Sequence, residues 1–306
     1  MPEHTFCYQS PLLGAYCRMS THNTLFSKPA SEVISRRTSW RSCTGEALDT
    51  DQRKRLDAFI NEQSEGIFGD KLRFSLVAAE KGDSESLRGL GTYGFIRGAS
   101  AFIIGAIDRD TDNLEDYGLR LQEIVLKATD LDLATCWLGG TFYRDRFSER
   151  IQTQEHELVP AVVSVGIPAE KRNMVDHVIR RVAGSRKRKA WEELFFHAES
   201  MTPLTPEGSG EYTRVLEMLR MAPSASNKQP WRLILSDNKV EFFLERTRGY
   251  RKPFFADLQR IDMGIAMCHF EQICEEVGLQ GRWQKSPAIP HHREDWEYIL
   301  TWVRSH

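Results

Sequence analysis

Along the first half of the chain, segments with the hydrophobic spacing of strands alternate with segments that have the spacing of helices. Short apolar runs predict strands at residues 72–78, 102–107 and 159–166, and apolar side chains at helical spacing predict helices at 50–62 and 116–131. This order favours helices packed on mainly antiparallel sheets. A helix connects the last two strands, so some parallel pairing between them stays open.

The second half shows the same two periods. The pattern predicts helices at residues 211–221 and 262–277 and strands at 231–235 and 240–244. A polar loop separates the first helix from the first strand, and Pro223 is expected to end that helix. Both halves therefore combine helices with short strands, which is typical of the α+β class.

The long helices of the two halves align without a gap. Asp116-Tyr117-Gly118 opens the first and Trp137 follows it, whereas Asp262-Met263-Gly264 opens the second and Trp283 follows it. Each tryptophan lies 21 residues after its aspartate (137 − 116 = 283 − 262 = 21). Chance similarity between two amphipathic helices is the alternative, but the matched ends favour a duplication. We predict two tandem α/β halves related by this duplication.

Local composition predicts where the halves meet. A basic run at residues 186–189 and a loop rich in proline and glycine at 203–210 mark the border. We therefore expect an N-terminal extension (residues 1–30), a first half (31–195) and a second half (196–306).

Composition narrows the class of protein. The 306 residues are 41% apolar and 27% charged, which is typical of a globular protein with a sizeable core. Because Lys+Arg 41 nearly balances Asp+Glu 43, no overall basic charge is present to hold nucleic acid or an anionic membrane. No apolar stretch reaches the length of a membrane span, and the six cysteines form no C-x-x-C pair. We expect a cytoplasmic protein with reduced cysteines.

An arginine-rich segment is the first candidate for ligand binding. In Arg37-Thr38-Ser39-Trp40-Arg41, alternation along an extended backbone places both guanidinium groups and the Ser39 hydroxyl on one side. Such a set suits a phosphate, a ribityl chain or the edge of an anionic ring. A solvated basic segment is the alternative.

Two further segments combine polar groups or glycines with a tryptophan. The string from Pro223 to Trp231 brings Ser224, Ser226 and Asn227 together, which suits a polar planar ligand or an ordinary corner between a helix and a strand. In Trp137-Leu138-Gly139-Gly140, paired glycines let backbone N–H groups approach a ligand closely, or merely end a helix.

Basic residues after the last strand of the first half complete the candidates. Arg186 and Arg188 can grip a phosphate, with Lys171 and Arg172 as further candidates, although solvated basic runs are common. None of the nine histidines shows metal-ligand spacing, and no Ser-His-Asp order is visible, so we predict neither a metal site nor a hydrolytic triad.

Taken together, these strings resemble the FMN-dependent nitroreductase family, in particular its single-chain, internally duplicated branch. The resemblance covers roughly residues 34–283. It departs at Ala134-Thr135, where Gly-Thr is common, and the chain before Lys28 has no counterpart. The strings that carry it are Arg37-x-Ser39-x-Arg41, Thr135-Cys136-Trp137-Leu138-Gly139-Gly140, Arg186-x-Arg188, Pro223-Ser224-x-x-Asn227-x-Gln229-Pro230-Trp231 and the residues from Asp262 to Glu271.

The resemblance implies a nitroreductase-like α+β fold in which the two tandem α/β halves form an intramolecular pseudo-dimer. It also implies a site for FMN between the halves, in which the flavin carries the chemistry and no catalytic side chain is needed. The phosphate would be held by Arg37 with Arg186 and Arg188, while Arg41 would lie near the N1/O2 edge of the ring and Ser39 near the ribityl chain or the ring. Backbone N–H groups around Gly139 and Gly140, next to Trp137 and Leu138, would face N5 and O4. The remaining contacts would come from the other half, from Pro223, Ser224, Ser226 and Asn227.

The halves complement each other in these strings. The first half has the arginine segment and the glycine pair but reads Ser64-Glu65-Gly66-Ile67-Phe68-Gly69 where the Pro-Ser string would stand. The second half has that string but lacks the arginine segment. We therefore expect one complete FMN site and one degenerate site per chain, and the intramolecular interface permits a monomer.

The expected function is NAD(P)H-dependent reduction of a small electron-poor acceptor, nitroaromatic or quinone-like, through FMN. Two alternatives stay open: a flavin storage or sensor protein without turnover, and a flavin-dependent dehydrogenase that uses no nicotinamide.

Overall fold

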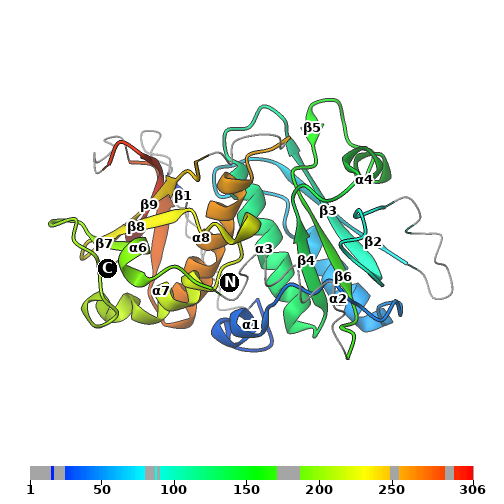
Figure 1. Ribbon diagram of the computed structural model, residues 1–306, viewed down its shortest axis with the longest axis horizontal. Coiled ribbons are helices and arrows are strands. Elements are labelled where there is room, and N and C mark those ends of the chain that lie inside the picture. Colours follow the sequence, from blue (N-terminus) through cyan, green and yellow to red (C-terminus); the bar gives the residue numbers. More distant parts are fainter. Residues whose placement is uncertain are drawn as a thin grey trace, which may run out of the picture.

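Two sheets flank a central pair of long helices (Figure 1). A computed structural model of the chain describes residues 15–16, 25–79, 87, 90–170, 187–248, 255–286 and 293–305. Helices α3 (Leu114–Asp130) and α8 (Leu258–Glu276) lie next to each other in the middle of the molecule. None of the helices in these ranges is long and apolar enough to cross a membrane.

The first half builds a sheet in the order β2-β3-β6-β4, with β5 paired to β3. Strand β3 is buried along its length up to Asp108, which explains its almost continuous apolar sequence. The elements are α1 (Ala30–Arg36), α2 (Thr50–Asn61), β2 (Leu72–Ala78), β3 (Ala101–Asp108), α3, β4 (Ala134–Leu138), α4 (Arg144–Arg150), β5 (Glu157–Leu158) and β6 (Val162–Gly166).

The second half builds a sheet in the order β1-β10-β11-β9-β8-β7. Strand β1 (Ala15–Tyr16) comes from the N-terminal extension and pairs with β10 at one edge. The other elements are α6 (Trp191–Leu194), β7 (Phe195–His197), η2 (Glu207–Tyr212), α7 (Thr213–Arg220), η3 (Ala225–Asn227), β8 (Trp231–Leu235), β9 (Lys239–Glu245), α8, β10 (Gly281–Gln284) and β11 (Trp296–Arg304).

The two halves share one topology. Each runs helix, strand, strand, long helix, strand, strand: α2-β2-β3-α3-β4-β6 in the first, with α4 and β5 inserted, and α7-β8-β9-α8-β10-β11 in the second. The strand orders β2-β3-β6-β4 and β8-β9-β11-β10 also correspond, and every pair within them is antiparallel. The predicted α+β fold with tandem halves is therefore confirmed.

Two alternatives that the sequence left open are excluded by the structure. Strands β3 and β6 pair antiparallel, because β4 lies between them in the sequence and reverses the chain once more after α3. Among the named strands, parallel pairing occurs instead between β7 and β8. The residues before the glycine pair do not form the end of a helix, since Ala134–Leu138 is strand β4.

The central helices approach each other closely at two glycines. A Cβ atom on Gly118 would lie 2.2 Å from the carbonyl oxygen of Ile261, and one on Gly264 would lie 2.0 Å from that of Glu115. These contacts mirror each other, because Ile261 stands at the same place in α8 as Glu115 does in α3 (261 − 115 = 264 − 118 = 146). The interface is therefore pseudo-symmetric, as in a twofold dimer.

Candidate functional site

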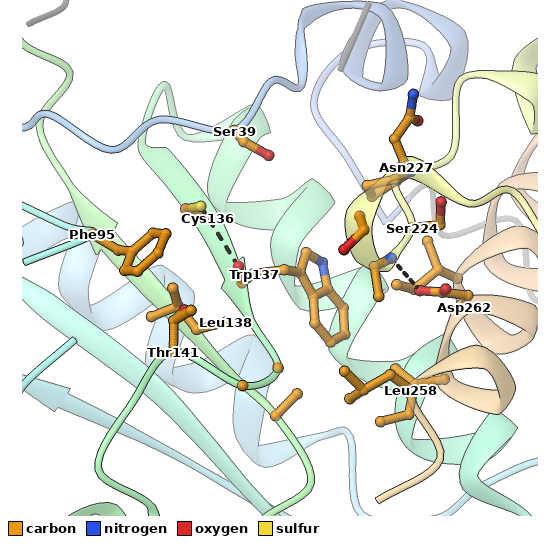
Figure 2. Close-up of a pocket in the computed structure, with 18 of the residues that line it drawn as sticks. Ser39, Phe95, Cys136, Trp137, Leu138, Thr141, Ser224, Asn227, Leu258 and Asp262 are labelled. Atoms are coloured by element: carbon orange, nitrogen blue, oxygen red, sulfur yellow. Dashed lines mark hydrogen bonds between the residues drawn. The ribbon is translucent and has the colours of Figure 1, made fainter. Parts of the chain in front are cut away.

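A cavity of about 350 Å³ lies between the two halves. It is within the usual range for ligand pockets. Figure 2 shows Ser39 and Cys136 on one side of it and Ser224, Asn227 and Asp262 on the other. Every predicted site residue except Arg186 lines this cavity, namely Arg37, Ser39, Arg41, Trp137, Leu138, Gly139, Gly140, Arg188, Pro223, Ser224, Ser226 and Asn227. Arg186, and with it Lys171 and Arg172, lies outside the described residues.

The arginine segment runs along strand β4. Helix α1 ends at Arg36, and the chain then extends so that the Trp40 amide donates to the Thr135 carbonyl at 2.8 Å. Ser39 forms a parallel bridge with Thr135. Arg37, Ser39 and Arg41 all line the cavity, so the segment contributes two basic residues and a serine to it.

The end of β4 forms a wall of the cavity. The indole of Trp137 belongs to this wall and is held by a chain of hydrogen bonds to residues of the central helices. Its Nε1 donates to Gln122 Oε1 at 2.9 Å, and Gln122 Nε2 lies 3.0 Å from His269 Nε2. His269 Nδ1 lies 3.0 Å from the Met218 carbonyl, which can only accept. His269 therefore carries its proton on Nδ1, and its Nε2 accepts from Gln122.

Burial keeps this histidine uncharged. His269 is fully buried, and burial lowers its pKa to about 3, although the hydrogen bond to Met218 acts in the opposite direction. The positive charges of Arg37 and Arg188 lower the pKa further. The chain of hydrogen bonds from Met218 to Trp137 therefore keeps one arrangement at neutral pH.

The loop from Pro223 to Gln229 forms the opposite wall. Ser226, Asn227 and Gln229 have φ values of 49°, 55° and 48°, a region that residues other than glycine rarely adopt. The loop is held by Asp262, whose carboxylate accepts from the Ala225 amide at 2.9 Å, and by Ser224, whose hydroxyl accepts from the Gln229 amide at 2.9 Å. Strained backbone held by its surroundings is characteristic of functional sites.

Arg188 fastens this loop to the end of the first half. Its guanidinium donates to Asn227 Oδ1 at 3.3 Å and to the Met221 carbonyl at 3.2 Å. Burial lowers the pKa of Arg188, and the positive charge of Arg220 lowers it further. Neighbouring cations of this kind favour the binding of an anion.

Asp262 is the cavity residue that the sequence interpretation left without a role. It is 3% exposed, and its Oδ2 is buried without a hydrogen-bond partner among the described residues. Burial raises its pKa well above the ordinary value, because the charged form loses its hydration. Its place in the Asp-x-Gly repeat was the available signal. Ile265 also lines the cavity and lies in the string from Asp262 to Glu271, whereas the lining residues Phe95, Leu258 and Ile261 lie in no motif.

Residues 30–274 match the family model described as "Putative TM nitroreductase". This match spans most of the chain. The chain belongs to the nitroreductase family. No curated relative matches the sequence.

A solved structure shows the same fold over most of this chain. A protein named as a nitroreductase of Thermotoga maritima is 20% identical, with a TM-score of 0.56, and the match covers 90% of this chain and 94% of that one. A nitroreductase from Desulfovibrio desulfuricans in complex with FMN is 20% identical (TM-score 0.36; 49% of this chain and 95% of that one). An FMN-dependent nitroreductase from Clostridium difficile is 18% identical (TM-score 0.37; 47% and 92%).

The other half of this nitroreductase-family chain has a counterpart of the strained loop. Asp116 accepts from the amides of Ile67 and Phe68 at 2.9 and 3.0 Å, as Asp262 does from Ala225. The Lys285 ammonium lies 4.7 Å from the centre of the Phe68 ring. Two loops of unrelated sequence are therefore anchored by equivalent aspartates.

The cavity and the equivalent place in the other half differ in their polar residues. Glu115, which is 1% exposed, occupies the position that corresponds to Ile261 of the cavity. Its carboxylate pairs with Arg260 at 2.6 Å.

Among the described residues, no group of three or more His, Cys, Asp or Glu side chains is arranged to hold a metal ion.

Proposed function

We propose that this protein is an FMN-dependent oxidoreductase that uses NAD(P)H to reduce a small electron-poor acceptor. Its family indicates oxidoreductase activity. The observation that carries the proposal is the meeting, in one cavity, of the arginine segment of the first half and the strained loop of the second.

The chemistry of the cavity fits FMN. Trp137, Leu258, Ile261 and Ile265 supply apolar surface for a flat ring, and the guanidinium groups of Arg37, Arg41 and Arg188 supply positive charge for a phosphate. Asp262 opposes an anion less than an exposed carboxylate would, because burial raises its pKa. FMN needs both features, since an apolar ring system is joined to a group of charge near −2.

Each group then has a role. Arg37 and Arg188, with Arg186 beyond the described residues, would hold the phosphate, and Arg41 would stabilise negative charge at the edge of the ring. Hydrogen bonds to the cofactor would come from Ser39, from the backbone around Gly139 and Gly140, and from Ser224, Ser226 and Asn227. When bound, FMN supplies hydride transfer between NAD(P)H and the acceptor.

We also propose one FMN per chain, bound between a first half of residues 31–195 and a second half of residues 196–306. The counterpart place lacks an arginine segment and contains the buried carboxylate of Glu115. The positive charge of Arg260 at that place is already paired with the Glu115 carboxylate at 2.6 Å, so it offers a phosphate little attraction.

Quantitative flavin release from the purified protein tests both proposals. We expect about one FMN per chain, and an anaerobic titration with NADH or NADPH should bleach the absorbance near 450 nm. Two FMN per chain would refute the proposed stoichiometry. Bound FMN that NAD(P)H does not reduce would favour a storage protein or a dehydrogenase without nicotinamide, and a protein that takes up no FMN would refute the site.

A variant pair tests the role of the basic wall. Arg188→Ala should weaken FMN binding at least tenfold, because it removes a cation and a support of Asn227. Arg55→Ala is the matched control, since Arg55 lies on α2 and pairs with Asp51 outside the cavity. Fluorescence titration of the apoprotein with FMN measures both, and equal affinities would contradict the assignment.

A further inference from the structure

Exposed aromatic side chains gather beside the cavity. Tyr93, Phe95, Tyr143 and Phe255 are 57%, 37%, 45% and 82% exposed. We call these four residues the aromatic rim. Among the large hydrophobic side chains exposed in the described ranges, the remaining one is Val277, at the far end of α8 from the cavity residue Leu258. Exposed apolar side chains gathered next to a cavity mark a binding surface.

Contacts connect the rim to the cavity. Phe95 lines the cavity, and Figure 2 shows it next to Leu138 and Thr141. Tyr143 follows Thr141 by two residues and pairs with Tyr93, the ring centres being 4.2 Å apart. Phe255 precedes the cavity residue Leu258 by three residues. The rim therefore continues the cavity wall outward, and both halves contribute to it.

The rim is held in place. Arg144 lies between two rings, its guanidinium 4.8 Å from the centre of Phe142 and 5.0 Å from that of Phe255. The Tyr143 ring covers Gly91 so closely that a Cβ atom there would lie 2.4 Å from a ring carbon. Tyr93 has a φ of 49°, a strained value that its surroundings must maintain. These aromatic faces are therefore positioned before a ligand arrives.

We propose that the aromatic rim binds the electron acceptor and selects flat acceptors with two fused rings over single-ring acceptors of the same chemistry. This inference rests on the proposed function. FMN would fill much of a cavity of about 350 Å³, so a second planar molecule must extend outward over the rim. A fused second ring gains stacking surface there, which a single ring cannot reach.

With a quinone as the acceptor, the electrons and protons of the reduction balance. Reduction to the hydroquinone takes up two electrons and two protons. NAD(P)H supplies both electrons and one proton as hydride, and the solvent supplies the second proton. The rim residues do not take part in this transfer, so their contribution is to binding and selectivity.

The test compares one-ring and two-ring acceptors in rim variants. We expect the ratio of kcat/KM for 1,4-naphthoquinone to that for 1,4-benzoquinone to fall about tenfold in Phe255→Ala and in Tyr143→Ala. Comparing ratios cancels the different reduction potentials of the two quinones. Phe255→Tyr, which keeps the ring, and Val277→Ala, an exposed apolar residue away from the cavity, should keep the ratio of the unaltered protein.

Binding of unreactive probes separates this inference from the proposed function. The dissociation constants of 2-naphthoate and benzoate, measured by calorimetry on the purified protein, require no turnover. We expect Phe255→Ala to lose most of the preference for 2-naphthoate, and a preference equal to that of the unaltered protein would overturn the inference. Absent reduction by NAD(P)H would refute the proposed function instead, and the probes would still decide the role of the rim.

Discussion

At the scale of single residues, the interface between the halves contains buried polar side chains that hydrogen-bond to one another. His269, Gln122 and Trp137 form one such chain, which crosses from α8 through α3 to β4. A buried histidine with both nitrogens hydrogen-bonded in the neutral form resists protonation. The orientation of the Trp137 indole at the cavity is thereby tied to the protonation state of a residue behind it.

His269 should make the protein sensitive to acid. Its pKa is about 3 when folded and near the ordinary value of about 6.5 when unfolded, so only the unfolded chain binds a proton between these values. Stability is therefore fully present above pH 6.5 and is lost as the pH falls toward 3, by up to about 1.4 kcal/mol per pH unit.

His269→Gln removes this titration and keeps an amide that can donate to Met218. The free energy of unfolding of the natural protein minus that of the variant, measured with urea at pH 7, 6 and 5, should become smaller as the pH falls. Other titrating groups cancel in this difference. A difference that does not change with pH would show that His269 is not kept neutral.

At the scale of elements, the strained loop depends on the N-terminal end of α8. Asp262→Ala should weaken FMN binding about tenfold or more, because the Ala225 amide loses its acceptor and the left-handed residues after it lose their support. Asp262→Asn should bind nearly as tightly, since an amide oxygen can accept from Ala225 and burial already disfavours the charged form of the aspartate.

The duplication supplies a control for this prediction. Asp116→Ala removes the equivalent anchor in the first half, where Asp116 accepts from Ile67 and Phe68. We expect both alanine variants to lose about 1–3 kcal/mol of unfolding free energy, and only Asp262→Ala to lose FMN affinity. Fluorescence titration and urea unfolding measure the two effects, and equal FMN affinities in the two variants would contradict a role of Asp262 at the site.

Elements were more predictable from the sequence than the site. Strands β2 and β8 have the predicted bounds, because each is an apolar run between turn residues. Helix α8 begins at Leu258, four residues before the predicted start, since its first turn includes polar Gln259 and Arg260. Strand β11 had no prediction, although it lies centrally in its sheet.

The cavity could be predicted in part, because its motifs are local strings. The sequence contains the arginine segment and the polar loop, but the approach of Arg188 to Asn227 depends on how the halves dock. Docking is decided by shape, for example by the glycines of the central helices, and neither periodicity nor propensity describes it. The aromatic rim likewise joins residues from distant loops without a common motif.

At the scale of the whole molecule, the two halves meet at α3 and α8, and Ile261, Asp262 and Ile265 of α8 line the cavity, so we expect the spacing of these helices to affect the cavity. Gly264→Ala would place a methyl group about 2.0 Å from the backbone oxygen of Glu115, which cannot move aside without shifting α3. We expect a loss of about 1–3 kcal/mol in unfolding free energy together with weaker FMN binding.

Gly208→Ala is the control for this change, because its nearest neighbour would lie at 3.5 Å, an ordinary contact. Thermal unfolding and FMN titration of both variants provide the comparison. If Gly264→Ala kept the stability and FMN affinity of the natural protein, the close approach of the helices would not govern the site.

The covalent link between the halves has a consequence for what each position can contain. In a dimer of identical chains, every substitution at the interface is made twice, so a carboxylate introduced in one site would enter the other as well. Here the equivalent positions hold Glu115 and Ile261, one charged and one apolar. Because the halves are joined in one chain, each can change at the interface without the same change in the other. One interface can therefore contain two places of different chemical character.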